Sequence, residues 1–227
     1  MKKILLTIVA LTTLAATTQA ALIAHWGFDS YTSGDFGPVS PEDGLQLTAN
    51  ITIDPAVPAN KLNSVAGTTL NDPRVTPSAS QAVSFKGPHA NSGFITIHLS
   101  GTGLSTFFLT YAAQRTQSGP HDNHWSYSID GGTTFTDVGV GQMPVDSITS
   151  TYSIQTINFA GITALDGAAD ILLHGTFVTN PGGGSADYDN FQILASIPEP
   201  VNVALALFGI GIVGLKFGRR LFSFVRR

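Results

Sequence analysis

The sequence predicts an all-β fold, an antiparallel β-sandwich of the jelly-roll type with about eight to ten strands. Three observations lead to this class. Short segments alternate apolar and polar residues, Gly, Asn and Pro separate these segments, and no stretch between the two ends has the period of an amphipathic helix. The composition agrees, because this middle part is rich in Thr, Ser and Gly and poor in Lys and Glu.

The strands are expected in the following order. Residues 22–28 form the first strand, and a proline-rich loop region over 30–81 holds one further strand at 45–53. In residues 94–99, Ile or Leu alternates with Thr96 and His98, which is typical of a half-buried strand. Strand patterns recur from Val83 onward, at 107–111, 125–129, 133–138, 152–159, 171–177 and 188–194.

The first twenty residues have the three parts of a secretory signal peptide. Lys2 and Lys3 give the positive start, residues 4–16 are apolar apart from three threonines, and Thr18 and Ala20 place small side chains before a cleavage site. We therefore expect a signal helix over 1–20 and export of the chain that follows. The alternative is an uncleaved N-terminal membrane anchor.

The last thirty residues combine a proline motif, an apolar stretch and a basic end. Pro198-Glu199-Pro200 precedes the apolar residues 203–215, and five Lys or Arg residues follow, including Arg219 and Arg220. This pattern predicts a single transmembrane helix at about 201–218 whose basic end stays in the cytoplasm. The expected organisation is a signal peptide (1–20), an exported β-sandwich (21–196) and an anchor segment (197–227).

The order of these C-terminal parts resembles the PEP-CTERM sorting signal. In that family the tail, here Pro198-Glu199-Pro200 with Arg219 and Arg220, is recognised by a membrane-embedded exosortase, in bacteria that build exopolysaccharide. The resemblance implies an exosortase and the inner membrane as partners, and a cell-surface or extracellular-matrix location after processing. This tail departs from the family pattern by continuing for seven residues beyond Arg220. A plain single-span anchor is the alternative.

The exported part is strongly acidic and contains no cysteine. Residues 21–197 hold fourteen acidic and four basic residues, which gives a net charge of −10. Such a surface repels nucleic acid and excludes it as a partner. Without cysteine, neither disulfides nor thiol chemistry can contribute.

Residues 128–135 have the spacing of an Asp-box, a hairpin turn found in β proteins. The motif positions are Ser128, Asp130, Gly132, Thr134 and Phe135. Asp130 is expected to accept backbone N–H bonds, the glycine to allow positive φ, and Phe135 to pack on the returning strand. The predicted role is structural, and the single copy argues against a propeller.

Residues 125–135 and 187–193 give the middle part a class-level resemblance to the lectin-like jelly-roll ectodomains of PEP-CTERM proteins. Closing such a fold brings the first and last strands together, so Asp29 is expected near Asp189. Asp187 and Asp189 lie on one side of a strand, and with Asp29 they could form a calcium site of the kind often present in carbohydrate-binding jelly rolls. The alternative is ordinary turn and edge hydrogen bonding.

Two further patterns have competing explanations. His121-Asp122-Asn123-His124 could hold a metal ion, although its spacing fits an exposed turn better. Five aromatic residues could form a platform for sugar rings, although alternating aromatic positions more often belong to a core. They are Trp26, Tyr111, Trp125, Tyr127 and Tyr188.

The sequence does not predict an enzyme. Glycoside hydrolysis needs two placed carboxylates, typically a Glu pair in lectin-like hydrolases, and Glu42 is the only glutamate of the exported part. We therefore expect a non-catalytic surface or matrix protein linked to exopolysaccharide, with no cofactor other than the candidate calcium. The alternatives are a calcium-supported carbohydrate-binding module and, with less support, a secreted polysaccharide hydrolase.

Overall fold

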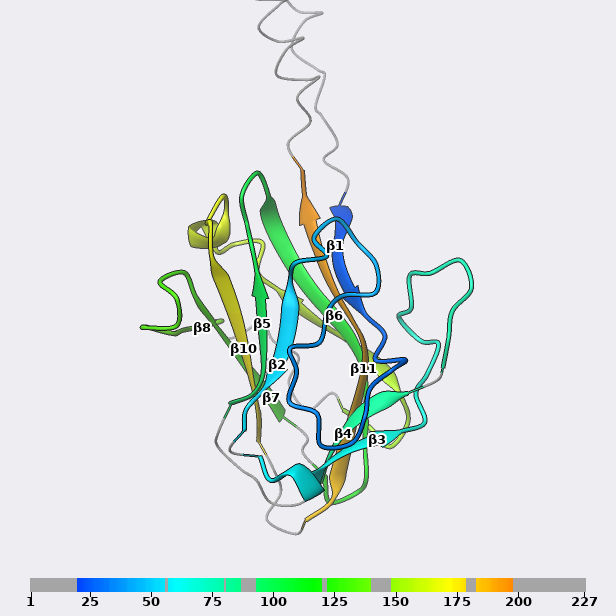
Figure 1. Cartoon of the computed structure of the whole chain (residues 1–227). Coiled ribbons are helices and arrows are strands. Elements are labelled where there is room, and N and C mark those ends of the chain that lie inside the picture. Colours follow the sequence, from blue (N-terminus) through cyan, green and yellow to red (C-terminus); the bar gives the residue numbers. More distant parts are fainter. Residues whose placement is uncertain are drawn as a thin grey trace, which may run out of the picture. The chain divides into compact units, whose positions relative to one another are not determined.

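Two antiparallel sheets pack against each other in this computed structural model (Figure 1). It describes residues 20–55, 57–79, 81–86, 93–119, 122–139, 148–178 and 183–197. The predicted class, an all-β antiparallel sandwich, is confirmed. Within these ranges no helix has the length and apolar character that crossing a bilayer requires. The expected signal and transmembrane helices, and the sorting residues Pro198, Glu199, Pro200, Arg219 and Arg220, lie outside the described residues.

The larger sheet has six strands. Their spatial order is β3 (Leu62–Val65), β4 (Ala82–Lys86), β11 (Ser185–Ser196), β6 (Ser105–Arg115) and β9 (Ser153–Asn158), and β1 (Ala20–Trp26) also pairs with β11. The smaller sheet has the order β2 (Asn50–Ile53), β5 (Gly93–Leu99), β10 (Ile171–Val178), β7 (Asp122–Ser128) and β8 (Thr136–Asp137). Two short 3-10 turns, η2 (Ala59–Lys61) and η3 (Thr163–Leu165), lie in the connections.

The strand predictions were mostly correct in place, apart from displaced ends, such as 133–135 outside β8, and three larger differences. Residues 45–49 form a loop instead of extending β2, because Gln46 holds them through hydrogen bonds to Ile23 and Ser100. Strand β3 was not predicted, because only Leu62 of its four residues is fully buried and no alternation marks it. The expected turn at 121–124 is also wrong in its described part, where Asp122–Ser128 already forms β7.

The first and last strands meet as expected. β1 runs antiparallel to β11, with Trp26 opposite Phe191 and Ala20 opposite Ser196. Both chain ends of the sandwich therefore lie at the same end of the six-stranded sheet. Residues Ala20–Ser196 form one compact unit with its own hydrophobic core, as a domain that folds by itself requires.

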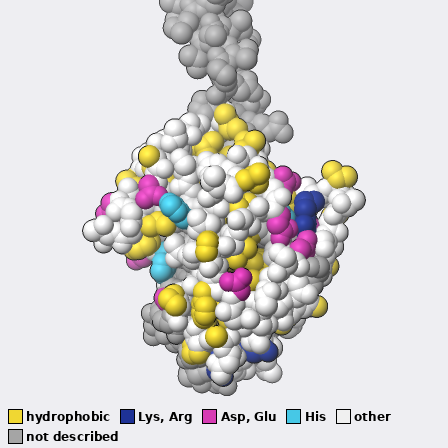
Figure 2. Space-filling view, viewed as in Figure 1, with side chains coloured by type: hydrophobic (Ala, Val, Ile, Leu, Met, Phe, Trp, Pro, Cys, Tyr) yellow, Lys and Arg dark blue, Asp and Glu magenta, His cyan; other side chains and the backbone are white. Residues whose placement is uncertain are grey.

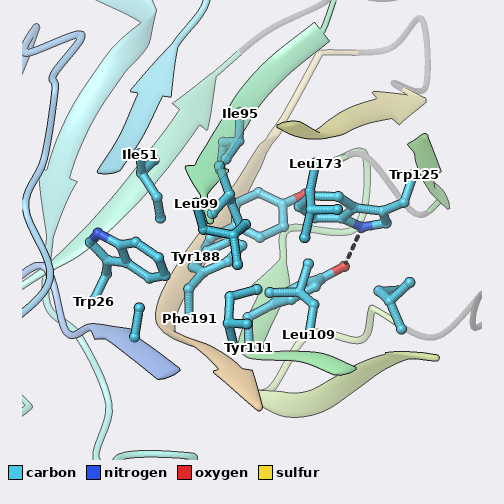
Figure 3. Packing of buried hydrophobic residues seen from close by; sticks show 14 of the residues in the cluster. Trp26, Ile51, Ile95, Leu99, Leu109, Tyr111, Trp125, Leu173, Tyr188 and Phe191 are labelled. Carbon is cyan, nitrogen blue, oxygen red and sulfur yellow. Dashed lines mark hydrogen bonds between the residues drawn. The ribbon is translucent and has the colours of Figure 1, made fainter. Parts of the chain in front are cut away.

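Aromatic side chains fill the centre of the sandwich (Figure 3). Trp26, Tyr111, Trp125 and Tyr188 are at most 1% exposed, and Tyr127 packs partly buried against them. These five residues therefore belong to the core and cannot form the sugar platform considered above. The Tyr111 hydroxyl accepts hydrogen bonds from Asn123 Nδ2 at 2.6 Å and from Trp125 Nε1 at 3.4 Å, the latter dashed in Figure 3. Their polar atoms are thereby paired inside the core.

Candidate functional site

Segment 66–79 covers part of the outer face of the six-stranded sheet. A β-bulge in β11 causes this, because Tyr188 and Phe191 both point into the core and leave Asp189 and Asn190 between them on the outer side. Asn190, at a φ of 50°, donates through Nδ2 to the carbonyl oxygens of Thr68 and Leu70 at 2.7 and 3.0 Å. The bulge thus fastens the segment to the sheet.

A single guanidinium group joins this segment to the loop after β1. Arg74 Nη1 contacts Asp29 at 2.6 Å and Glu42 at 2.8 Å, while Nη2 contacts the buried carboxylate of Asp72 at 2.5 Å. Burial would raise the pKa of Asp72, but hydrogen bonds from Arg74 and Ser78 hold it at about 2. Burial, followed by the nearby Asp29 carboxylate, raises the pKa of Glu42. The cluster is an internal ion-pair network.

The three aspartates of the calcium prediction have separate partners. Asp29 is held by Arg74, Asp187 Oδ2 accepts from Gln114 Nε2 at 3.0 Å, and Asp189 Oδ2 accepts from the Thr68 N–H at 2.7 Å. Within the described ranges, no three His, Cys, Asp or Glu side chains are grouped so that they could hold a metal ion. None of these contacts supports the calcium site formed by Asp29, Asp187 and Asp189, which stays a prediction.

Among the acidic residues of the described chain, Asp189 has the most unusual environment. It is fully buried, and burial raises its pKa to about 8 even though the N–H groups of Thr68 and Asn190 donate to it. The neighbouring carboxylates Asp29 and Glu42 act in the same direction as burial. Asp29 and Asp189 are thus close enough to interact, as the closing of the fold led us to expect.

The Asp-box residues form a hydrogen-bonded turn between β7 and β8. Ser128 Oγ donates to Asp130 Oδ1 at 2.7 Å and accepts from the Gly132 N–H at 2.9 Å. Asp130 Oδ1 also accepts the Thr134 N–H at 3.0 Å, and Oδ2 accepts the Thr134 hydroxyl at 2.6 Å. Phe135 does not enter the core but remains 43% exposed, beside His174.

The outer face of the five-stranded sheet carries a straight polar row. The strand register places one residue of each strand in this row, at neighbouring positions of β2, β5, β10, β7 and β8. Adjacent strands lie about 4.8 Å apart, so the row is about 19 Å long. Its members are Thr52, Thr96, His174, Ser126 and Asp137. We call these five residues the polar row.

Imidazole and aromatic groups border the polar row. The ring of Phe135 meets His174 edge to face, with centroids 5.0 Å apart, and Thr96 Oγ1 lies 3.4 Å from His174 Nδ1. Burial lowers the pKa of His174, which favours the neutral form of its ring, although the charge of Asp54 acts in the opposite direction. One row further along, His98 Nε2 pairs with Asp170. Figure 2 shows histidines beside hydrophobic side chains on this part of the surface.

Sequence reasoning missed the two features that organise these faces. Arg74 was noted only as one of four basic residues, although its neighbour Asp72, two positions earlier, was a signal for a local ion pair. The polar row was visible only in part, as Thr96 and His98 alternating with Ile and Leu in β5. Its other members lie on different strands, and the pairing register between those strands cannot be read from any one segment of the sequence.

No family model and no curated protein matches the chain. Among solved structures, it is similar to the CBM22-1–CBM22-2 tandem domain of Paenibacillus barcinonensis Xyn10C, with 12% identity and a TM-score of 0.48, over 82% of this chain and 48% of that one. A second is the CBM22-1–GH10 part of Clostridium thermocellum xylanase 10B complexed with xylohexaose, with 10% identity and a TM-score of 0.43 over 78% of this chain.

The chain spans only 29% of that xylanase structure. A third similar structure is TmCBM61 in complex with β-1,4-galactotriose, with 12% identity and a TM-score of 0.38, over 74% of this chain and 92% of that one. No site residue is carried over from these proteins to this chain.

Proposed function

We propose that the chain is an exported, non-catalytic protein of the cell envelope whose jelly-roll domain binds polysaccharide across the outer face of the five-stranded sheet. The observation that carries this is the polar row with Phe135 beside it. Hydroxyl, imidazole and carboxylate groups lie in one line of about 19 Å, on a sheet face where they can meet a ligand.

The chemistry of this face suits a sugar chain. Saccharides offer hydroxyl groups, for which the Thr, Ser, His and Asp side chains of the polar row supply both donors and acceptors. They also have apolar C–H surfaces, which an aromatic ring can cover. Among the described side chains, Phe135 is the most exposed ring of Phe, Tyr or Trp, at 43%. It lies at the row and not on the opposite sheet.

The same face does not favour catalysis. The single glutamate of the domain, Glu42, is held by Arg74 on the other side of the sandwich, away from the polar row. The carboxylates near the row include Asp137 in it, Asp170 bound to His98, and Asp54, whose charge acts on His174. Because Glu42 is the only glutamate of residues 21–197, this face lacks the Glu pair that is typical of lectin-like hydrolases.

Location follows from the two ends of the chain. The signal peptide exports the domain, and the tail resembling PEP-CTERM holds it at the inner membrane until an exosortase acts near Pro198-Glu199-Pro200. The mass of the mature protein from cells tests this part. Loss of both ends supports processing, whereas retention of residues 201–227 would indicate a plain anchor.

Binding of the purified domain, residues 20–196, to a panel of polysaccharides tests the proposed function. Xylan and β-1,4-galactan are the first probes. Phe135→Ala should weaken binding about two- to tenfold, because the lost ring contact is worth about 0.5–1.5 kcal/mol. The matched control is Ile154→Ala, which removes a side chain of similar exposure (49% against 43%) from β9 of the other sheet and should leave binding unchanged.

Two outcomes would change the account. If no polysaccharide binds, the proposed function is wrong and a purely structural role in the matrix remains. If binding is real but a chelator abolishes it, the calcium-supported carbohydrate-binding alternative is favoured.

A further inference from the structure

Three of the four basic side chains in the acidic domain gather at one end of the six-stranded sheet. Lys61 ends η2 just before β3, Lys86 ends β4, and Arg115 ends β6. Leu62 pairs with Phe85, Phe85 with Ala186, and Ala186 with Arg115, so the three cations lie at the same end of the sheet. Arg115 belongs to this inward-facing row, whereas Lys86 is one residue beyond it, on the outer face. We call Lys61, Lys86 and Arg115 the basic rim.

The spacing of the basic rim follows from the strand order. Lys86 and Arg115 are separated by two strand intervals, and Lys61 and Arg115 by three. At about 4.8 Å per interval, their backbones lie about 10 and about 14 Å apart. Three positive charges spread over this length suit a ligand with repeated negative charges, not a single small anion.

The basic rim has no internal counterions in the described part of the chain. No ion pair to Lys61, Lys86 or Arg115 occurs there, whereas Arg74 contacts three carboxylates. Asp187, one row away, accepts its hydrogen bond from Gln114. In a domain of net charge −10, three cations with no ion-pair partner among the described residues lie at one end, a separation of charge that favours an anionic ligand.

Arg115 is held rigidly in this position. Its backbone N–H donates to Thr149 O at 2.8 Å, Nε donates to Ile148 O at 2.7 Å, and Nη1 donates to Gln117 O at 2.9 Å. Among the described residues, no hydrogen bond from Nη2 is present. A fixed guanidinium binds a carboxylate with less loss of side-chain freedom than a mobile one.

Arg115 also lines a hollow of about 480 Å³. This volume lies in the range of about 300–1,000 Å³ that is usual for ligand sites. The other described lining residues are polar apart from one and offer hydroxyl and amide groups. They are Thr116, Gln117, Ile148, Thr149 and Ser150. A cation next to hydroxyl and amide groups matches a sugar that carries a carboxylate.

We propose that the basic rim binds a carboxylate-bearing polysaccharide, one that contains uronic acid residues, as a second site beside the polar row. This inference rests on the proposed polysaccharide-binding function. In it, Arg115 takes a sugar carboxylate in the hollow, while Lys86 and Lys61 attract further carboxylates of the same chain. Figure 2 shows few basic side chains on the viewed face, some of them at its lower end.

The position of the basic rim argues for a polysaccharide over a membrane surface. β11 begins with Ser185, next to Lys86, and ends with Ser196, after which the anchor segment follows in the sequence. The eleven residue steps from Ser185 to Ser196 span about 36 Å. The rim therefore lies at the end of the sheet opposite Ser196, the residue after which the anchor segment follows in the sequence. Nucleic acid is disfavoured by the acidity of the remaining surface.

The test measures binding of the domain of residues 20–196 to polygalacturonate and to its fully methyl-esterified, uncharged form. The domain should bind polygalacturonate and not the ester. Lys86→Gln should weaken this binding about threefold, and the Lys61→Gln, Lys86→Gln, Arg115→Gln triple variant about tenfold or more, in keeping with exposed charge pairs. The Lys61→Gln, Lys86→Gln double variant keeps the hydrogen bonds of Arg115. It therefore tests the same prediction if the triple variant does not fold.

The matched control is Thr48→Glu. It lowers the net charge by one, as Lys86→Gln does, but at the end where Gln46 bonds to Ile23, and should change affinity less than about 1.5-fold. The inference would be overturned if Thr48→Glu and Lys86→Gln weakened binding equally. It would also be overturned if the domain bound the ester, single-stranded DNA or anionic vesicles as tightly as polygalacturonate. If a neutral glycan binds at the polar row but polygalacturonate does not, only this inference fails; if neither binds, the proposed function fails too.

Discussion

The outer faces of the two sheets differ in what their polar residues contact. On the six-stranded sheet, Asp189 and Asn190 are fully buried and hydrogen-bonded to the covering segment 66–79. On the five-stranded sheet, the polar row carries side chains that are partly or fully exposed. An outward-facing polar residue therefore has a structural role where another segment covers it. Where no part of the described chain covers it, such a residue can contact a ligand.

The largest expected effect comes from removing the ion-pair centre of the covered face. Arg74→Met should lower the free energy of unfolding by about 3 kcal/mol, because the buried Asp72 carboxylate then lacks its countercharge. Urea unfolding of the domain measures this. Arg74→Lys, which keeps the charge but not the fork of donors, should recover part of the loss. A change below about 0.5 kcal/mol for Arg74→Met would mean that the network does not hold the segment.

Removing the amide at the bulge should have the next largest effect. Asn190→Ala leaves the carbonyl groups of Thr68 and Leu70 without their donor and should cost about 2–3 kcal/mol. Asn190→Gly is the control, because it tolerates the positive φ while losing the same bonds. If the Gly variant is as stable as wild type, backbone conformation and not hydrogen bonding accounts for the residue.

The covered face should also make stability depend on pH. Folding raises the pKa of Asp189 from about 4 to about 8, so its neutral form is favoured in the folded state. Its contribution is complete below about pH 4 and is lost as pH rises toward 8, with a slope of at most about 1.4 kcal/mol per pH unit. Asp189→Asn should flatten the curve between pH 5 and 8, measured by urea unfolding.

Asp72 acts in the opposite direction and in another range. Its pKa is lowered to about 2, so its contribution to stability is present above about pH 4 and is lost as pH falls further.

The Asp189→Asn variant also has a result that would contradict the account. If its unfolding free energy has the same slope between pH 5 and 8 as that of the wild type, Asp189 is ionised in the folded domain.

The smallest effects are expected on the open face. Phe135→Ala should change the free energy of unfolding by less than about 1 kcal/mol, because the ring is 43% exposed and lies outside the core, beside His174. Thermal unfolding of the same preparations used for binding measures it. A loss as large as that of Arg74→Met would indicate that Phe135 supports the fold, and would weaken its assignment to a ligand.

The sequence predicted those parts that depend on local alternation. β5 was visible because Ile95, Ile97 and Leu99 alternate with polar residues, and the Asp-box turn because its hydrogen bonds join residues four positions apart. β3 was not visible, since its four residues gain stability from pairing with β4 and not from their own pattern.

The candidate sites were less accessible to sequence analysis than the fold. The polar row and the basic rim each combine strands that are distant in the chain, so their residues become neighbours only through register. The aromatic residues show the reverse case. They suggested a sugar platform by their type, yet their parity along the strands directs Trp125 and Tyr188 into the core.

The most direct test of the account is to map a bound glycan on the domain by NMR. With a polysaccharide fragment that binds, the backbone amides of β5, β7 and β10 around Thr96, Ser126 and His174 should show the largest shift changes. The amide chemical shifts of β4, β11 and segment 66–79 should not change when the fragment is uncharged. Shift changes confined to the covered face, with none at the polar row, would contradict the claim that the open sheet is the binding face.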